Sequence, residues 1–174
     1  MRDEKLMRSL KDVGDKMVNC FRNQKKVLWC GNGGSAADAQ HLSAELSGRF
    51  YYNRPPLNSE ALHVNTSYLT AVANDYGYEE VYARLVKGMG QKGDMLVGLS
   101  TSGNSKNVIK AMEIAIDLGM ITVGFTGNNG GNMKAVCSYL LDIPSSDTPR
   151  IQECHLMLGH ALCEWVELEI FPNK

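Results

Sequence analysis

Apolar residues recur along the chain in two patterns, one typical of amphipathic helices and one of fully buried strands. Near the N-terminus they fall at steps of three and four residues, which predicts a helix over about residues 2–23. Short continuous apolar runs follow, each the length of a strand, and we predict strands at Lys26–Cys30, Met95–Leu99, Ile121–Phe125 and Tyr139–Ile143. A further short strand is predicted at Ala61–Val64.

Helical patterns separate these runs. We predict a helix from about Ser35 to Gly48, because Ser35 has the chemistry of an N-cap. Other helices are predicted at Tyr68–Ala73, Glu79–Met89, Asn104–Leu118 and Arg150–Ile170. Continuous apolar strands that alternate with helices indicate an α/β protein with a covered parallel sheet. Ligands bind such sheets beyond the carboxyl ends of the strands, so functional residues should follow Cys30, Leu99 and Phe125.

The segment Ser100–Ser105 has the composition of a phosphate-binding loop. It leaves a strand, turns at Gly103 and opens a helix, so several hydroxyls and the free N–H groups of the first helical turn should converge on one point. The alternative is a polar loop that only caps a helix. The glycine-rich segment Gly31–Ser35 lies in the same kind of position, but Ala36 breaks the dinucleotide-binding pattern and the P-loop lysine is missing.

A candidate acid–base group lies on two predicted helices. His41 and Glu45 are four residues apart and project from one helix face, which Asp38 shares. On the last helix, Gln152 and His160 are the polar residues of interest. A histidine on a mostly apolar helix is more often a core or boundary residue, so spacing alone leaves catalysis as one of two interpretations.

Composition narrows the classes of function. Lysine plus arginine number 18 and aspartate plus glutamate 19, for a net charge of −1, which argues against a nucleic-acid-binding protein. The apolar runs are too short to span a bilayer and the N-terminal segment is charged, so we expect a cytoplasmic protein without a membrane partner. The five cysteines include no CxxC pair, and we expect reduced, buried thiols rather than a zinc–thiolate site.

Several motifs together resemble one known family. They are Cys30–His41 (CGNGGSAADAQH), Ala44–Arg49 (AELSGR), Ala73–Gly77 (ANDYG), Ser100–Asn104 (STSGN) and Arg150–Glu153 (RIQE). In these motifs and in their order the chain closely resembles the phosphoheptose isomerases, members of the sugar isomerase (SIS) family. The resemblance covers nearly the whole chain.

The resemblance implies a fold, an assembly and a reaction. The fold is a single SIS domain over residues 1–174, with a doubly wound, flavodoxin-like parallel sheet of about five strands flanked by helices. The assembly is a homotetramer with active sites at subunit boundaries, in which the N-terminal helix takes part in oligomer packing. The reaction converts sedoheptulose 7-phosphate to D-glycero-D-manno-heptose 7-phosphate, the first step towards the ADP- and GDP-activated heptoses of lipopolysaccharide or other surface glycans.

The resemblance also implies roles for individual residues. Glu45 and His160 match the acid–base pair, and one zinc ion per subunit would be bound by His41, Glu45, Gln152 and His160. The positions that match substrate contacts are Asn32, Gly33, Ser35, Asp75, Ser100, Thr101, Ser102, Ser105 and Gln152. Gln152 and His160 are eight residues apart, about 12 Å along a straight helix, so their joint coordination of one ion needs side chains that reach towards each other, a distorted helix start, or a second subunit.

Two other functions compete with this one. A non-catalytic SIS tetramer that binds the replication initiator DnaA shares the Arg-Ile-Gln-Glu region, but lacks equivalents of Glu45 and His160. Another phosphosugar enzyme on the same scaffold, such as a hexose phosphate isomerase or an etherase, is less favoured by the His-x-x-x-Glu pattern. The chain also departs from the family pattern at Asn65 and Pro149, where relatives carry aspartate.

Overall fold

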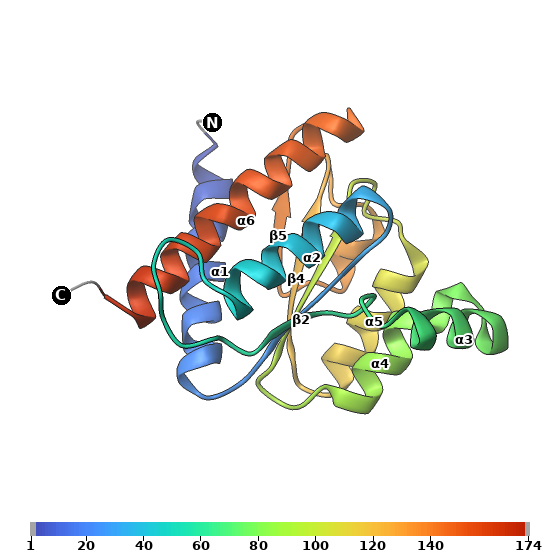
Figure 1. The fold of residues 1–174 in the computed structure, drawn as a ribbon. Helices are drawn as coiled ribbons and strands as arrows, with labels where there is room; N and C mark the ends of the chain where they lie inside the picture. The colour runs from blue at the N-terminus through green and yellow to red at the C-terminus, as the bar shows by residue number, and fades with distance from the viewer. Residues whose placement is uncertain (1–2, 173–174) are drawn as a thin grey trace.

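Five parallel strands form one sheet at the centre of the molecule (Figure 1). The computed structural model describes residues 3–172. The strand order is β2-β1-β3-β4-β5, the flavodoxin-like order of a doubly wound sheet. This confirms the fold class predicted from the sequence. The strands are β1 (Val27–Gly31), β2 (Ser59–Ala61), β3 (Met95–Ser100), β4 (Ile121–Thr126) and β5 (Tyr139–Asp142).

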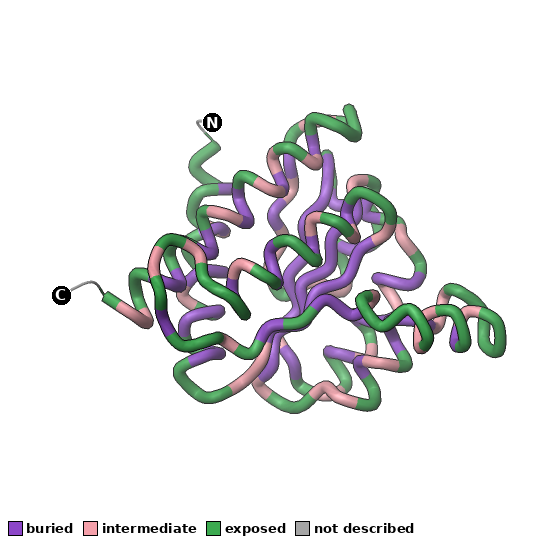
Figure 2. The backbone as a smooth tube through the Cα atoms, viewed as in Figure 1, coloured by how far each residue is buried: buried purple, intermediate pink, exposed green. Residues whose placement is uncertain are grey.

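Helices cover both faces of the sheet (Figure 1). The elements packed on one face are α1 (Glu4–Arg22), α2 (Gly34–Ser47) and α6 (Thr148–Ile170). Those on the other face are α3 (Thr66–Tyr76), α4 (Val81–Met89) and α5 (Lys106–Asp117), with the 3₁₀ turns Tyr78–Glu80 and Gly131–Ala135. Helix α3 projects to one side, and within it only Val72 is buried (Figures 1 and 2).

Two hydrophobic cores lie on opposite faces of the sheet, which explains the continuous apolar runs. Figure 2 shows the strands as the buried centre of the molecule. Every residue of β1 and β3 is buried. Neighbouring positions of β1 point into opposite cores, with Trp29 on the face of α2 and α6 and Leu28 on the face of α4 and α5. The indole Nε1 of Trp29 donates to Ser59 Oγ at 2.9 Å, so this buried polar group is satisfied.

Most element boundaries differ from the prediction by one to three residues, and three of these differences have a clear local reason. The strand predicted at Ala61–Val64 lies at Ser59–Ala61, because that stretch pairs with Val27, Leu28 and Trp29. The apolar pattern did not indicate this strand, because two of its three residues are polar. Ser59 accepts the hydrogen bond from Trp29, and Glu60 is exposed at the sheet edge. Helix α2 begins at Gly34 with Gly33, not Ser35, at the N-cap, and α5 begins at Lys106 rather than Asn104.

The cysteines are free thiols, as expected. Cys20, Cys30 and Cys163 are buried, whereas Cys137 and Cys154 are half-buried, so the expectation of burial holds only in part. Burial raises the pKa of Cys20, Cys137 and Cys163 to about 12. Among the helices that the structure describes, none has both the length and the apolar character needed to cross a membrane.

Candidate active site

Helices α2 and α6 lie side by side and run in the same direction (Figure 1). Near their starts, Gly34 lies against the Gln152 amide, and two turns further along Gly159 lies against Leu42. A Cβ on Gly159 would overlap both methyl groups of Leu42, so the glycine allows a close approach of the two helices. The polar residues that neighbour this contact, one on each helix, are therefore brought together.

His41, Glu45 and His160 form one polar cluster across this helix pair. The Nε2 atoms of His41 and His160 are 2.8 Å apart, and a Glu45 carboxylate oxygen lies 3.4 Å from His41 Nε2. One donor atom from each residue lies within 4.8 Å of the other two. His41 is exposed, Glu45 and His160 are half-buried, and the Phe50 ring centre lies 5.7 Å from that of His160. The cluster is therefore accessible to solvent, and the Phe50 ring packs against one side of it.

The donor set of this cluster fits a zinc ion. Two imidazole nitrogens and a carboxylate oxygen are common zinc ligands, and three protein ligands leave one tetrahedral position for substrate. Without a cation, one Nε2 of the histidine pair donates a hydrogen bond and the other accepts it. Gln152, the fourth predicted ligand, has its amide packed against Gly34 at the start of α2. Its coordination of a metal stays a prediction.

Hydroxyl groups converge in the loop between β3 and α5, as the sequence predicts. Ser100 Oγ lies 2.8 Å from Ser105 Oγ and 3.4 Å from Ser102 Oγ. Gly103 has φ +65° and packs against the backbone of Gly130, which joins this loop to the one that follows β4. Thr101 is half-buried, and its carbonyl accepts from the Gly127 amide at 2.9 Å. The arrangement offers several donors to one anionic group.

The loop after β1 is tied to α5 by a pair of amides. Asn32 Nδ2 donates to Asn107 Oδ1 at 2.9 Å, and Asn107 Nδ2 donates back to Asn32 Oδ1 at 2.8 Å. The hydroxyl of Tyr78 donates to the same Asn32 oxygen at 3.2 Å. Asn107 and Tyr78 were missed by sequence reasoning. Asn107 is buried beside the apolar positions of α5, and a polar residue on that face was the available signal.

The remaining predicted substrate contacts differ in their surroundings. Ser35 is buried in the first turn of α2, where its amide donates to Asn32 O at 3.1 Å. Gly33 has φ +56°, and a Cβ added to it would meet no atom within 4 Å. Asp75 is exposed at the end of α3, and its carboxylate accepts from Asn74 Nδ2 at 2.9 Å. The described contacts of Asp75 do not join it to the other site residues, so its role stays a prediction.

Comparison with known proteins identifies the family. The SIS domain model matches residues 2–127. A phosphoheptose isomerase from Aneurinibacillus thermoaerophilus is 51% identical over 172 residues, 99% of this chain and 87% of the relative. One from Akkermansia muciniphila is 57% identical over 162 residues, 93% of this chain and 86% of the relative. The structure of phosphoheptose isomerase GmhA from Neisseria gonorrhoeae superposes with a TM-score of 0.88 at 43% identity, covering 93% of this chain and 86% of that one.

The chain belongs to the phosphoheptose isomerase family. As a member of this SIS-domain family it is an isomerase of a sugar phosphate. The two departures from the family pattern are accommodated locally. Asn65 caps α3, because its Oδ1 accepts from the Tyr68 amide at 3.0 Å, a task that asparagine and aspartate perform equally well. Pro149 lies in the first turn of α6, where a missing N–H costs no helical hydrogen bond.

The two histidines of α6 have opposite environments within this family fold. His160 belongs to the polar cluster, whereas His155 is fully buried and edge-on to the Phe125 ring. The Nε2–H group of His155 donates to the Thr126 carbonyl at 3.1 Å, and its Nδ1 has no partner in the part of the chain that the structure describes. Burial lowers the pKa of His155 to about 4, although the Thr126 hydrogen bond acts in the opposite direction.

His155 is expected to make folding stability pH-dependent. The unfolded chain takes up a proton on this imidazole near pH 6.5, whereas the folded protein does so only near pH 4, so the stabilisation is complete above pH 6.5 and is lost as the pH falls towards 4. Between pH 7 and 5 this group should lower the free energy of unfolding by about 2 kcal/mol. Urea denaturation checks this, with His155→Gln as the variant that loses this part of the pH dependence. Equal slopes in both proteins would contradict it.

Proposed function

We propose that the chain is a phosphoheptose isomerase that converts sedoheptulose 7-phosphate to D-glycero-D-manno-heptose 7-phosphate. The observation that carries the proposal is the meeting of Glu45 and His160, from distant parts of the chain, in one solvent-accessible cluster. The curated relatives of about 50% identity, named phosphoheptose isomerases, support the choice of a heptose phosphate. The product would enter the synthesis of nucleotide-activated heptoses.

The isomerisation consists of proton transfers at two carbons and two oxygens of the substrate. From the ketose, one proton leaves C1 and one is added to O2, which forms an enediol. The enediol then loses the proton on O1 and gains one on C2, which forms the aldose. Glu45 transfers the carbon-bound proton and His160 the oxygen-bound ones. A carboxylate and an imidazole are both effective general acid–base groups near neutral pH, and each contributes roughly 10²–10⁴ in rate.

The far end of the substrate would be held by the loop Ser100–Ser105. The hydroxyls of Ser102 and Ser105 lie 3.4 and 2.8 Å from that of Ser100, and α5 starts directly after them. Each neutral hydrogen bond contributes only about 1 kcal/mol net, so a phosphate dianion needs several donors together. This binding energy aligns C1 and C2 with Glu45 and His160.

The proposal includes one zinc ion per subunit, held by His41, Glu45 and His160, with Gln152 as the further ligand. A bound zinc ion would supply a Lewis acid that polarises the oxygens of the substrate. The role of the chain is to hold the three donor atoms within 4.8 Å of one another from two packed helices. Because a carboxylate has two oxygens, Glu45 can use one as a ligand and keep the other for proton transfer.

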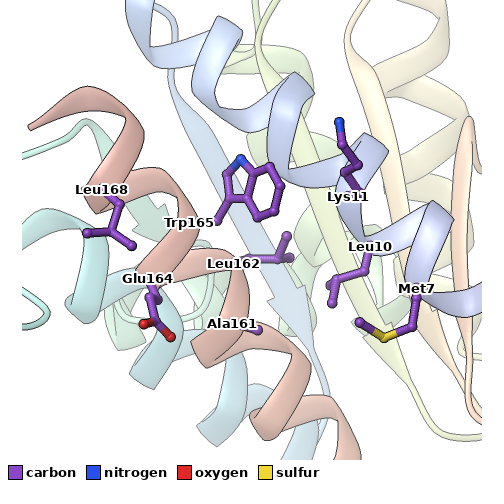
Figure 3. Close-up of a pocket in the computed structure, with 8 residues that line it drawn as sticks. All are labelled: Met7, Leu10, Lys11, Ala161, Leu162, Glu164, Trp165 and Leu168. Carbon is purple, nitrogen blue, oxygen red and sulfur yellow. The ribbon is translucent and has the colours of Figure 1, made fainter. Parts of the chain in front are cut away.

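We also propose a cytoplasmic homotetramer with active sites at subunit boundaries. A groove of about 360 Å³ between α1 and α6 supports self-association, because its lining is mainly apolar (Figure 3). Met7, Trp165 and Leu168 line it and are 49%, 37% and 47% exposed. A second copy of the chain would cover these side chains. The free thiols support a reducing compartment.

One assay tests the proposed function. The purified protein is incubated with sedoheptulose 7-phosphate, and the anomeric proton signals of an aldoheptose phosphate are followed by NMR. We expect product to appear, to stop appearing after treatment with a chelator, and to return when zinc is added. The sedimentation mass of the same preparation tests the assembly.

Other outcomes of this assay would contradict the proposal in distinct ways. No turnover with zinc present would favour a non-catalytic SIS protein that binds a partner. Full turnover after complete removal of metal would retain the isomerase and reject the zinc site. Faster turnover of a hexose phosphate under the same conditions would reject the heptose as substrate.

A further inference from the structure

A buried ion pair lies beside the candidate active site. Arg54 Nε and Glu167 Oε1 are 2.9 Å apart, and the two side chains are only 2% and 1% exposed. Arg54 comes from the loop after α2, and Glu167 lies on α6, two turns after His160. A buried ion pair is often no better for stability than apolar residues of similar volume. What this pair contacts is therefore more informative than its charge.

Arg54 holds the end of the helix that carries Glu45. Its Nη2 donates to the backbone carbonyl of Glu45 at 2.8 Å, and its Nη1 donates to those of Leu46 at 2.7 Å and Gly48 at 3.1 Å. The last carbonyls of a helix have no partner within the helix. The planar guanidinium supplies several donors in a fixed geometry, which an ammonium group cannot do. The backbone of Glu45 is thus fixed directly by Arg54.

Glu167 holds the loop that covers His160. Its two carboxylate oxygens accept from the amides of Phe50 at 2.9 Å and Tyr51 at 2.6 Å. The Phe50 ring, in turn, lies with its centre 5.7 Å from that of His160. One carboxylate on α6 therefore fixes the loop after α2 against the helix that carries His160.

We propose that Arg54 and Glu167 are positioning residues for the isomerisation: as a pair they fix the Glu45 backbone relative to the His160 ring. This inference rests on the proposed function, because it names those two groups as the acid–base pair. Both side chains are buried, so the role that we propose for the pair is indirect. It acts by joining the end of α2, the loop after it and α6 into one rigid unit around the cluster.

A double variant separates positioning from stability. Replacing both partners, Arg54→Met with Glu167→Leu, leaves no unpaired buried charge, so the fold should persist. We expect kcat to fall by about 10²-fold with little change in KM, because a displacement of about 1 Å at the reacting groups has an effect of that size. Thermal melting establishes that the variant is folded at the assay temperature.

The chain offers a matched control pair at the opposite end of the sheet. Asp94 lies 2.6 Å from Lys26 Nζ, is buried, and accepts from the amides of Lys26 and Gln91 at 3.1 and 2.8 Å. It therefore repeats the chemistry of Glu167 away from the site. The double variant Lys26→Met with Asp94→Leu should retain the wild-type kcat.

A second measurement does not depend on turnover. The chain has four histidines, whose imidazole C–H signals can be observed by NMR. In the Arg54/Glu167 double variant the signals of His41 and His160 should shift, while those of His63 and His155 stay in place. If wild-type protein fails to isomerise the heptose phosphate, the proposed function is wrong, and these signals still decide whether the pair positions the cluster.

Two results would overturn the inference. The first is a folded double variant with wild-type kcat and unchanged His41 and His160 signals, which would make the pair structural only. If that variant does not fold, Arg54→Lys decides, because it keeps the charge but not the planar set of donors. A wild-type kcat in Arg54→Lys would then reject the inference, and a fall in kcat with unchanged KM would support it.

Discussion

Replacing Glu45 by glutamine is expected to lower kcat by about 10²–10⁴-fold and to leave the protein folded. The carboxamide has nearly the same shape as the carboxylate but cannot accept the carbon-bound proton. The Glu45 side chain is 24% exposed, so the substitution buries no unpaired charge. His160→Gln should have an effect of similar size, because the variant loses the group that moves protons between the substrate oxygens.

Deuterium exchange in D₂O measures this step directly. Wild-type protein should incorporate deuterium at the carbon-bound positions of the substrate, and both variants should not. Glu153→Gln is the matched control, because Glu153 also lies on α6, two turns before His160, pairs with Arg150 at 2.8 Å and is 59% exposed. Undiminished exchange in Glu45→Gln and His160→Gln alike would reject the acid–base pair.

Placing an alanine at Gly159 is expected to lower both stability and kcat, through helix packing. The Cβ would overlap the Leu42 methyl groups and push α6 away from α2, next to the His41–His160 contact. Alanine gains about 1 kcal/mol over glycine in helix propensity, but overpacking a buried contact costs about 1–3 kcal/mol. The net effect should be destabilising, and kcat should fall by about tenfold or more because the cluster opens.

The controls for Gly159→Ala come from the same chain. Gly88 also lies in a helix, but a Cβ there would meet no atom within 4 Å, so Gly88→Ala should be neutral or slightly stabilising. Shortening the opposing side chain, in Gly159→Ala with Leu42→Ala, removes the overlap and should restore part of kcat. Urea denaturation and steady-state kinetics measure both effects. A Gly159→Ala protein with wild-type kcat would show that the close helix contact does not set the cluster geometry.

The central strands and most helices could be predicted because burial on both faces leaves a simple pattern. β1, β3 and β4 are almost entirely buried, and their flavodoxin-like arrangement followed from the family resemblance. The edge strand β2 was misplaced because only alternate residues are buried and one of them is the polar Ser59. The starts of α2 and α5 were misjudged because glycines and serines there fit a cap, a loop or a first turn equally well.

The candidate site could be predicted in part for similar reasons. His41 and Glu45 share a helix face by spacing alone, and the hydroxyl-rich loop follows a strand end, so local pattern suffices for both. The contact of His41 with His160 spans 119 residues and depends on the fold, so only the family resemblance could suggest it. The Arg54–Glu167 pair, 113 residues apart, gave no local signal of its partner.

The burial of the thiols has a practical consequence for studying this enzyme. Alkylating reagents attack the thiolate, and burial raises the pKa of Cys20 and Cys163 to about 12, so few of these thiols are ionised at pH 7. Modification of these positions must therefore wait until the chain opens. Their rate of labelling reports how often the folded protein opens, and any slowing by sugar phosphates would report ligand binding without a turnover assay.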